Sequence, residues 1–223
     1  MGITAGLGQV ELTGAMLIFS VLAAVVLGLL IGSFLNVVIV RVPAGRSVVS
    51  PRSACMTCNE TIAERDNIPV LSWLLLRGRS RCCDEPIGAR YPVVEATTGL
   101  VFGVLTAWVG ISWVLPALLY LAAISIALTM IDLELKRLPN AITFPSYPIG
   151  AALLTLAALG EGEPKRLLGA AIGAVALYVF YFVLMFINPR GMGFGDVKLS
   201  GILGLYLGWF GWQYTVSEAS SDF

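Results

Sequence analysis

The chain has 223 residues, of which 57% are hydrophobic and only 13% are charged, and its formal net charge is zero. An ordinary soluble domain has about 25% charged residues, so a chain this apolar must leave much of its surface to lipid. The neutral balance argues against a nucleic-acid-binding protein, because such proteins neutralise phosphates with an excess of basic residues.

The first uncharged run, residues 14–40, is long enough to cross a bilayer, for which about 20 apolar residues suffice. It is too long for the apolar region of a signal peptide, and Glu11 rather than a basic cluster precedes it. Residues 41–91 are charged and contain all four cysteines, so we expect a soluble loop domain there. Its apolar stretch, residues 68–76, is too short to cross a membrane and is expected to pack within the loop or to lie on the membrane surface.

Further apolar runs are predicted to span the membrane, with boundaries uncertain by a few residues: 92–110, 114–131, 141–160, 167–188 and 199–214. A tight turn is expected between the first two of them. No segment suits a strand, so the predicted fold is an all-α, polytopic transmembrane helical bundle with a cysteine-containing loop. The predicted divisions are an N-terminal segment with the first span, the loop, a transmembrane domain and a polar, disordered tail: residues 1–40, 41–91, 92–214 and 215–223.

The basic residues indicate an orientation. If the N-terminus lies outside, 12 of the 14 Lys and Arg side chains face the cytoplasm, and only Lys165 and Arg166 face outward. The opposite topology would invert this ratio, so we expect the cysteine loop in the cytoplasm. Asp132, at the end of the third span, and Asp196, at the start of the sixth, then both lie at the cytoplasmic edge.

Asp132 and Asp196 are the candidate catalytic groups. A charge near hydrocarbon costs roughly 2.5–3.5 kcal/mol, so each needs an explanation. Asp132 could be an interfacial acid that Lys136 neutralises four residues later. Asp196 could be the N-cap of its span, but a cap does not explain the three glycines of GMGFGD, which allow close backbone approach or unusual dihedral angles.

The sequence contains no histidine, so proton chemistry must use carboxylates, thiols, lysine or tyrosine. Two carboxyl groups brought together near lipid cannot both ionise easily, and one is held protonated. The pair then supplies an acid and a base around a shared water, as in aspartic proteases.

Four stretches in chain order are similar to one family. GFGDVK, which begins at Gly193, resembles the Gly-x-Gly-Asp signature of polytopic aspartic peptidases, and specifically of prepilin peptidases. The others are GLLIGSFLNVVIVRVP from Gly28, ARYPVVE from Ala89 and IDLELKRLPN from Ile131. A lone Gly-x-Gly-Asp would be weak evidence, whereas the ordered set is specific.

The resemblance implies that Asp132 and Asp196 are catalytic, with Gly193, Gly195 and Lys198 as the surrounding motif. It implies cleavage after a glycine between the basic leader and the apolar helix of type IV prepilins or pseudopilins. The expected place is the cytoplasmic face of the bacterial inner membrane, in pilus assembly or type II secretion. Bifunctional members, which have a long loop like this one, also methylate the new N-terminus with S-adenosylmethionine.

The cysteines suggest a metal site. Cys55 and Cys58 form a CxxC, and a cytoplasmic loop does not favour a structural disulfide. The family resemblance implies a second CxxC, but this chain has Ser80 in the first position, Cys83 in the second and Cys82 between them. Structural zinc is expected, and the alternatives stay open: a four-thiolate site, a three-thiolate site with another ligand, or free thiols. No Gly-rich nucleotide fingerprint marks a site for S-adenosylmethionine.

Other polar and small residues in the spans have simpler explanations. Glu95 is expected to pair with Arg90, with a role in methyl transfer as the alternative. Asn36 is expected to form a hydrogen bond between helices, and Gly28 with Gly32 to pack two helices together.

Two rival functions and one departure from the family complete the sequence evidence. A transporter or channel predicts carboxylates along a path across the membrane, and a non-catalytic scaffold with a zinc loop leaves GFGD without a purpose. Family members continue through a further apolar helix after residue 213, where this chain has a polar tail, so we expect one side of the bundle to be exposed. The sequence determines neither the pilin substrate nor the oligomeric state.

Overall fold

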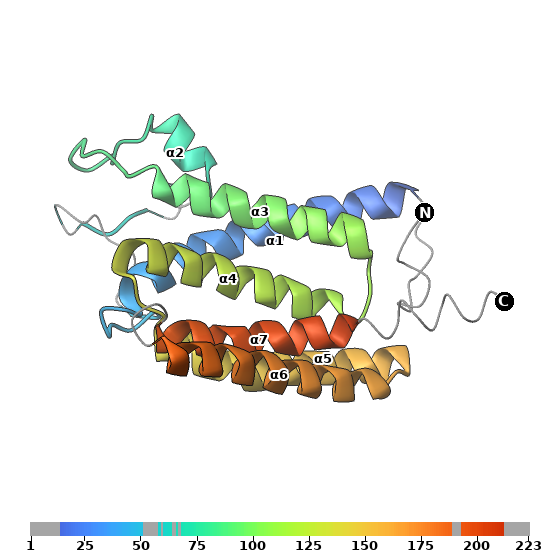
Figure 1. Cartoon of the computed structure of the whole chain (residues 1–223). Helices are drawn as coiled ribbons and strands as arrows, with labels where there is room; N and C mark the ends of the chain where they lie inside the picture. Colours follow the sequence, from blue (N-terminus) through green and yellow to red (C-terminus); the bar gives the residue numbers. More distant parts are fainter. Residues whose placement is uncertain are drawn as a thin grey trace. The chain divides into compact units, whose positions relative to one another are not determined.

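The computed structural model describes residues 14–50, 58, 60–63, 66, 68–188 and 193–211. Within these ranges the regular structure is helical, apart from isolated bridge pairing such as that of Arg79 with Pro86 (Figure 1). The predicted all-α class is confirmed. The helices are α1 (Gly14–Arg41), α2 (Leu71–Leu75), α3 (Arg90–Val109), α4 (Leu115–Leu135), α5 (Asn140–Glu161), α6 (Lys165–Ile187) and α7 (Phe194–Phe210).

Five helices of the described chain are long and apolar enough to cross a membrane: α1, α3, α4, α5 and α6. They correspond to the first five predicted spans. The predicted tight turn between α3 and α4 is also present, and Gly110 adopts a φ of 70°, where glycine is favoured.

The sixth predicted span differs most from the structure. We expected a helix over 199–214, but α7 begins at Phe194 and ends at Phe210. Its 17 residues give a length of about 26 Å, slightly less than the ~30 Å of a hydrocarbon core. The prediction was wrong at the start of the helix because it followed the apolar run, whereas the backbone becomes helical before Asp196.

The described chain divides into two compact units. One contains α1, α2, α3 and residues 118–136, which include most of α4, and the other contains residues 112–117, α5, α6 and α7. Asp132 belongs to the first unit and Asp196 to the second.

In the first unit, α1 packs closely on α3. A Cβ added at Gly28 would lie 2.7 Å from the Thr98 carbonyl oxygen, and one at Gly32 would lie 2.7 Å from the Glu95 Cα. Larger residues at these positions would push the helices apart, so the helix-packing interpretation of this GxxxG pair is confirmed. The expected interhelical hydrogen bond of Asn36 is also present, because its Nδ2 donates to the Tyr91 carbonyl at 3.1 Å.

In the second unit, α6 and α7 lie side by side (Figure 1). Glycines of the two helices face each other. A Cβ at Gly169 would lie 2.7 Å from the carbonyl oxygen of Gly208, and one at Gly173 would lie 2.7 Å from the Cα of Gly208. Two GxxxG pairs, one on each helix, therefore allow the backbones into contact. This packing holds the helix that carries Asp196.

Candidate functional site

Asp196 lies in the first turn of α7, three residues after the N-cap Gly193. Its Oδ2 accepts a hydrogen bond from the Gly193 N–H at 3.2 Å, and its own N–H donates to the Gly193 carbonyl at 3.1 Å. The alternative that Asp196 is itself the N-cap is wrong, because the helix starts two residues earlier. The carboxylate is exposed and lies at the helix end whose dipole favours negative charge.

The glycines around Asp196 have different reasons. A Cβ at Gly195 would lie 3.0 Å from the Leu138 Cβ, so a small residue lets the start of α7 approach the segment before α5. Gly193 has an extended backbone with φ −80°, and a Cβ there would meet only ordinary contacts. Close approach is therefore confirmed for Gly195, neither described glycine has an unusual φ, and Gly191 lies outside the described residues.

Lys198 connects the start of α7 to the start of α5. Its Nζ donates to Asn140 Oδ1 at 2.8 Å. The same ammonium lies 4.9 Å from the ring centroid of Phe144 and 4.5 Å from that of Phe194, which is within cation–π range. Lys198 therefore positions the helix start by contacts across to α5.

Tyr147 is a polar residue of this region that sequence reasoning missed. Its hydroxyl donates to the carbonyl of Lys198 at 2.6 Å and occupies the space in which a Cβ of Gly201 would lie. The signal in the sequence was weak, because Tyr147 is one of four hydroxyl side chains in this apolar span and lies 51 residues from its partner. Tyr147 thus supports α7 one turn beyond Asp196.

Asp132 lies in the last turn of α4 and is exposed. The helix ends as the Lys136 N–H donates to the Asp132 carbonyl at 2.8 Å, with Lys136 at a φ of 51°. The predicted charge neutralisation by Lys136 is not found: within the described ranges no ion pair joins the two side chains. The Asp132 carboxylate is thus presented at the end of the helix without a partner among the described residues.

The end of α4 is held by the neighbour of Asp132. Glu134 forms an ion pair with Arg90 at 2.6 Å, and the Arg90 guanidinium lies 5.1 Å from the centroid of the Tyr91 ring. The expected pairing of Arg90 with Glu95 is wrong. Residues five apart lie on different faces of a helix, whereas residues three or four apart face each other. Glu95 instead accepts a hydrogen bond from the Val70 N–H at 2.7 Å.

Three of the predicted metal ligands come together in the loop. The Sγ atoms of Cys58, Cys82 and Cys83 all lie within 4.8 Å of one another and are exposed. Cys58 and Cys82 are 3.0 Å apart, and Cys82 and Cys83 are 3.7 Å apart. Zn–S bonds of about 2.3 Å in a tetrahedral site place sulfurs roughly 3.8 Å from each other. The Cys82–Cys83 distance matches this value and the Cys58–Cys82 distance is shorter, so the three thiols are close enough to share one ion. Cys55 lies outside the described residues.

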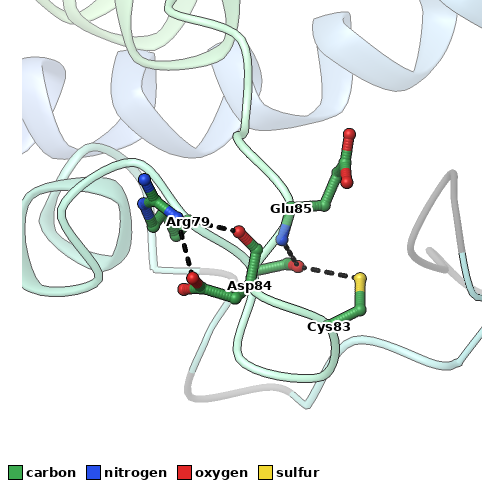
Figure 2. A network of polar contacts seen from close by, with 5 residues as sticks. Arg79, Cys83, Asp84 and Glu85 are labelled. Carbon is green, nitrogen blue, oxygen red and sulfur yellow. Dashed lines mark hydrogen bonds and ion pairs between the residues drawn. The ribbon is translucent and has the colours of Figure 1, made fainter.

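Ser80, which stands in the first position of the second CxxC, helps to fold the turn that presents the thiols. Its Oγ lies 3.2 Å from Cys83 Sγ and accepts a hydrogen bond from the Glu85 N–H at 3.1 Å. Figure 2 shows Cys83 and Glu85 on this turn, which an Arg79–Asp84 ion pair of 2.7 Å closes.

An ion pair also joins this turn to an earlier part of the loop. Arg81 binds Asp66, with Nη2 to Oδ1 at 2.9 Å and Nε to Oδ2 at 3.0 Å. The hydrogen bond to Asp66 and its negative charge raise the pKa of Arg81 above its ordinary value. The turn that carries Cys82 and Cys83 is therefore anchored on both sides.

Fold and site together define a multi-spanning helical membrane protein with a cysteine loop between its first two spans and a Gly-x-Gly-Asp helix start. Residues 26–109 match the family model of the bacterial peptidase A24 N-terminal domain, and residues 119–221 match that of the type IV leader peptidase family. The chain belongs to the type IV leader peptidase family.

Several curated relatives share the name prepilin leader peptidase/N-methyltransferase. The protein of Klebsiella pneumoniae is 39% identical over 86% of this chain and 87% of its own length, and that of Stutzerimonas stutzeri is 36% identical over 86% and 74%. The protein of Myxococcus xanthus is 41% identical over 82% of this chain, which spans 55% of that relative's length. No solved structure matches the chain.

Proposed function

We propose that the protein is an intramembrane aspartic endopeptidase that removes the leader of type IV prepilins or pseudopilins. We also propose that it methylates the new N-terminus with S-adenosylmethionine. Family membership and the relatives' name support both activities. The observation that carries the peptidase assignment is the exposed Asp196 carboxylate, which its own helix start holds through Gly193.

The path of the chain supports one membrane face for both aspartates. Asp132 lies in the last turn of α4, and residues 136–139 lead directly to the start of α5. The bond from Lys198 to Asn140 brings the start of α7 to the start of α5. With the candidate spans α4 and α5 each crossing the membrane, this path is consistent with one face for Asp132 and Asp196, and the distribution of basic residues favours the cytoplasmic face.

In the aspartic-protease mechanism two carboxyl groups share one proton, so that one serves as base and the other as acid. The carboxylate that serves as base takes a proton from water, and this water attacks the carbonyl of the leader's last residue, whose bond to the nitrogen of the next residue then breaks. The neutral carboxyl gives its proton to the carbonyl oxygen or to the leaving amine. The basic leader stays in the cytoplasm in this proposal, which agrees with the cytoplasmic face that the basic-residue count favours for both aspartates.

The peptidase assignment is tested by coexpressing a prepilin with Asp132→Ala or Asp196→Ala. Both variants are expected to leave the prepilin at full length on a gel or by mass. Glu163→Ala is the matched control, because Glu163 is an acid just beyond the opposite end of α5 and is expected to leave processing intact. Normal processing by either aspartate variant would contradict the peptidase assignment.

For the metal, we propose that Cys58, Cys82 and Cys83 hold structural zinc, with Cys55 or another group as the fourth ligand. Zinc in such a site would order the loop and takes no part in peptide cleavage. Purified protein is expected to contain about one zinc ion per chain and to lose it in Cys82→Ser or Cys83→Ser. Ser80→Ala is the control that keeps the zinc, and Cys55→Ser distinguishes a four-thiolate from a three-thiolate site. If no form of the protein contained zinc, the proposal would be wrong and the thiols would be free.

The methyl-transfer proposal has a separate readout. The mature pilin N-terminus should carry the mass of an added methyl group with the wild-type enzyme. It should be cleaved but unmethylated with Cys55→Ser, if the cysteine loop supports methyl transfer. A pilin that is cleaved but unmethylated by the wild-type enzyme would contradict this part of the proposal alone.

A further inference from the structure

The short helix α2 carries an exposed apolar face in the otherwise polar loop. Leu71, Leu74 and Leu75 are 57%, 58% and 82% exposed, and Ile68 just before the helix is exposed as well. These four side chains lie within eight residues of the chain. Single exposed leucines are common on protein surfaces, but a cluster of this kind marks an interaction site.

Contacts hold α2 in a defined place beside the start of α3 (Figure 1). The Val70 N–H donates to Glu95 Oε2 at 2.7 Å, and Glu95 is only 8% exposed. Val70 adopts a φ of 60°, which is unfavourable for a β-branched residue, so surrounding contacts must maintain it. One of them is the bond from Trp73 Nε1 to the Ile87 carbonyl at 2.9 Å.

The attachment to Glu95 sets the depth of α2 in the membrane. Glu95 is five residues into α3 from Arg90, a rise of about 7.5 Å along the helix. The exposed apolar side of α3 already begins at Val93 and continues to Leu100. Because α3 is a candidate membrane span, α2 lies level with the boundary between lipid head groups and acyl chains.

The positive charge beside α2 also suits contact with lipid. Arg77 follows the helix, is exposed, and forms no ion pair with another described residue. Arg79 and Arg81, by contrast, are paired with acids of the loop. A guanidinium that has no acid partner in the described part of the loop and lies next to an apolar face matches an anionic phospholipid, whose phosphate lies just above the acyl chains.

We propose that α2 is a membrane-surface anchor, in which Ile68, Leu71, Leu74 and Leu75 enter the acyl boundary and Arg77 binds a lipid phosphate. Glu95 is its positioning residue, because it holds the Val70 backbone at that depth. The anchor keeps the cysteine loop on the bilayer surface. This inference goes beyond the proposed function and is measured without substrate, so its failure would leave the peptidase assignment untouched.

Photo-crosslinking tests the anchor in the full chain. The photoreactive residue benzoylphenylalanine is introduced at Leu75, and the protein is irradiated in vesicles of phosphatidylethanolamine and phosphatidylglycerol. Leu100, on the exposed side of α3, is the positive control, and Asp84, an exposed residue of the same loop, is the negative control. We expect the yield of lipid adducts at Leu75 to approach that at Leu100 and to exceed that at Asp84 about tenfold. A yield at Leu75 no higher than at Asp84, or adducts to a second protein chain instead, would overturn the proposal.

The positioning role of Glu95 has its own readout. Glu95→Gln keeps an oxygen that accepts from the Val70 N–H, whereas Glu95→Ala removes it. Hydrogen exchange at residues 70–75 and the yield of lipid adducts from Leu75 should stay near wild type in Glu95→Gln. In Glu95→Ala, exchange should be faster and the adduct yield about tenfold lower. Unchanged exchange and yield in Glu95→Ala would show that Glu95 does not position α2.

Discussion

The helix ends that carry the two aspartates are held in different ways. The start of α7 is held from within: the Gly193 backbone binds Asp196, and Gly195 lets the helix approach Leu138. The end of α4 is held through a side-chain pair between Glu134 and Arg90, which are 41% and 23% exposed. Backbone contacts and close packing respond to changes of volume, whereas a partly exposed ion pair responds to charge and salt. Asp196 should therefore be sensitive to the first kind of change and Asp132 to the second.

The largest effect is expected at Gly195. Gly195→Val would force atoms into the space of Leu138, and overpacking of this kind costs about 1–3 kcal/mol of the free energy of unfolding. Thermal unfolding in detergent measures this loss. Gly193→Ala is the control: its new Cβ meets only ordinary contacts, and its unfolding temperature should match the wild type. Equal losses in both variants would contradict the packing explanation.

A smaller effect is expected where α7 meets α5. Lys198→Met and Asn140→Ala each remove the same hydrogen bond, so their losses should overlap in the double variant. Hydrogen bonds that involve a charged group contribute about 1.5–3 kcal/mol, and a coupling near the lower end is expected because this one is exposed. Unfolding in detergent gives the coupling, and simple additivity of the two losses would show that the bond contributes nothing.

The smallest effect is expected for the pair that holds the end of α4. Arg90→Glu should cost up to about 1 kcal/mol, and the exchanged pair Arg90→Glu with Glu134→Arg should recover part of it. Added salt should reduce the coupling between these residues, but should leave the effect of Gly195→Val unchanged. Loss of this contrast, with both regions responding alike to salt, would break the comparison between the two helix ends.

Much of the fold follows from the apolar runs, because a backbone in lipid must satisfy its own hydrogen bonds in a helix. The start of α7 does not follow from hydropathy, since Gly193 and Asp196 are polar or small yet belong to the helix start. The sequence also did not decide whether the apolar stretch of the loop, residues 68–76, packs within the loop or lies on the membrane surface. Its place beside α3 depends on the Val70–Glu95 bond, which joins residues 25 apart in the chain.

The residues of the candidate site could be predicted from the sequence, but the contacts that support them could not. Sequence context singled out Asp196 and Gly195, and the family resemblance added Asp132. Besides the local Gly193–Asp196 bond, the contacts that support the two helix ends join residues 44 and 58 positions apart: Arg90 with Glu134, and Asn140 with Lys198. Pairing between distant segments leaves no local pattern, and the same is true of the approach of Cys58 to Cys82.

The central claim is that Asp132 and Asp196 act as one catalytic unit. The rate of leader cleavage by purified protein should be compared for Asp132→Asn, Asp196→Asn and the double variant, since Asn preserves size but cannot ionise. Residues that act as a unit are strongly non-additive, so each single variant should lose as much activity as the double. Cleavage at the wild-type rate by either single variant, or losses that multiply in the double, would contradict the claim.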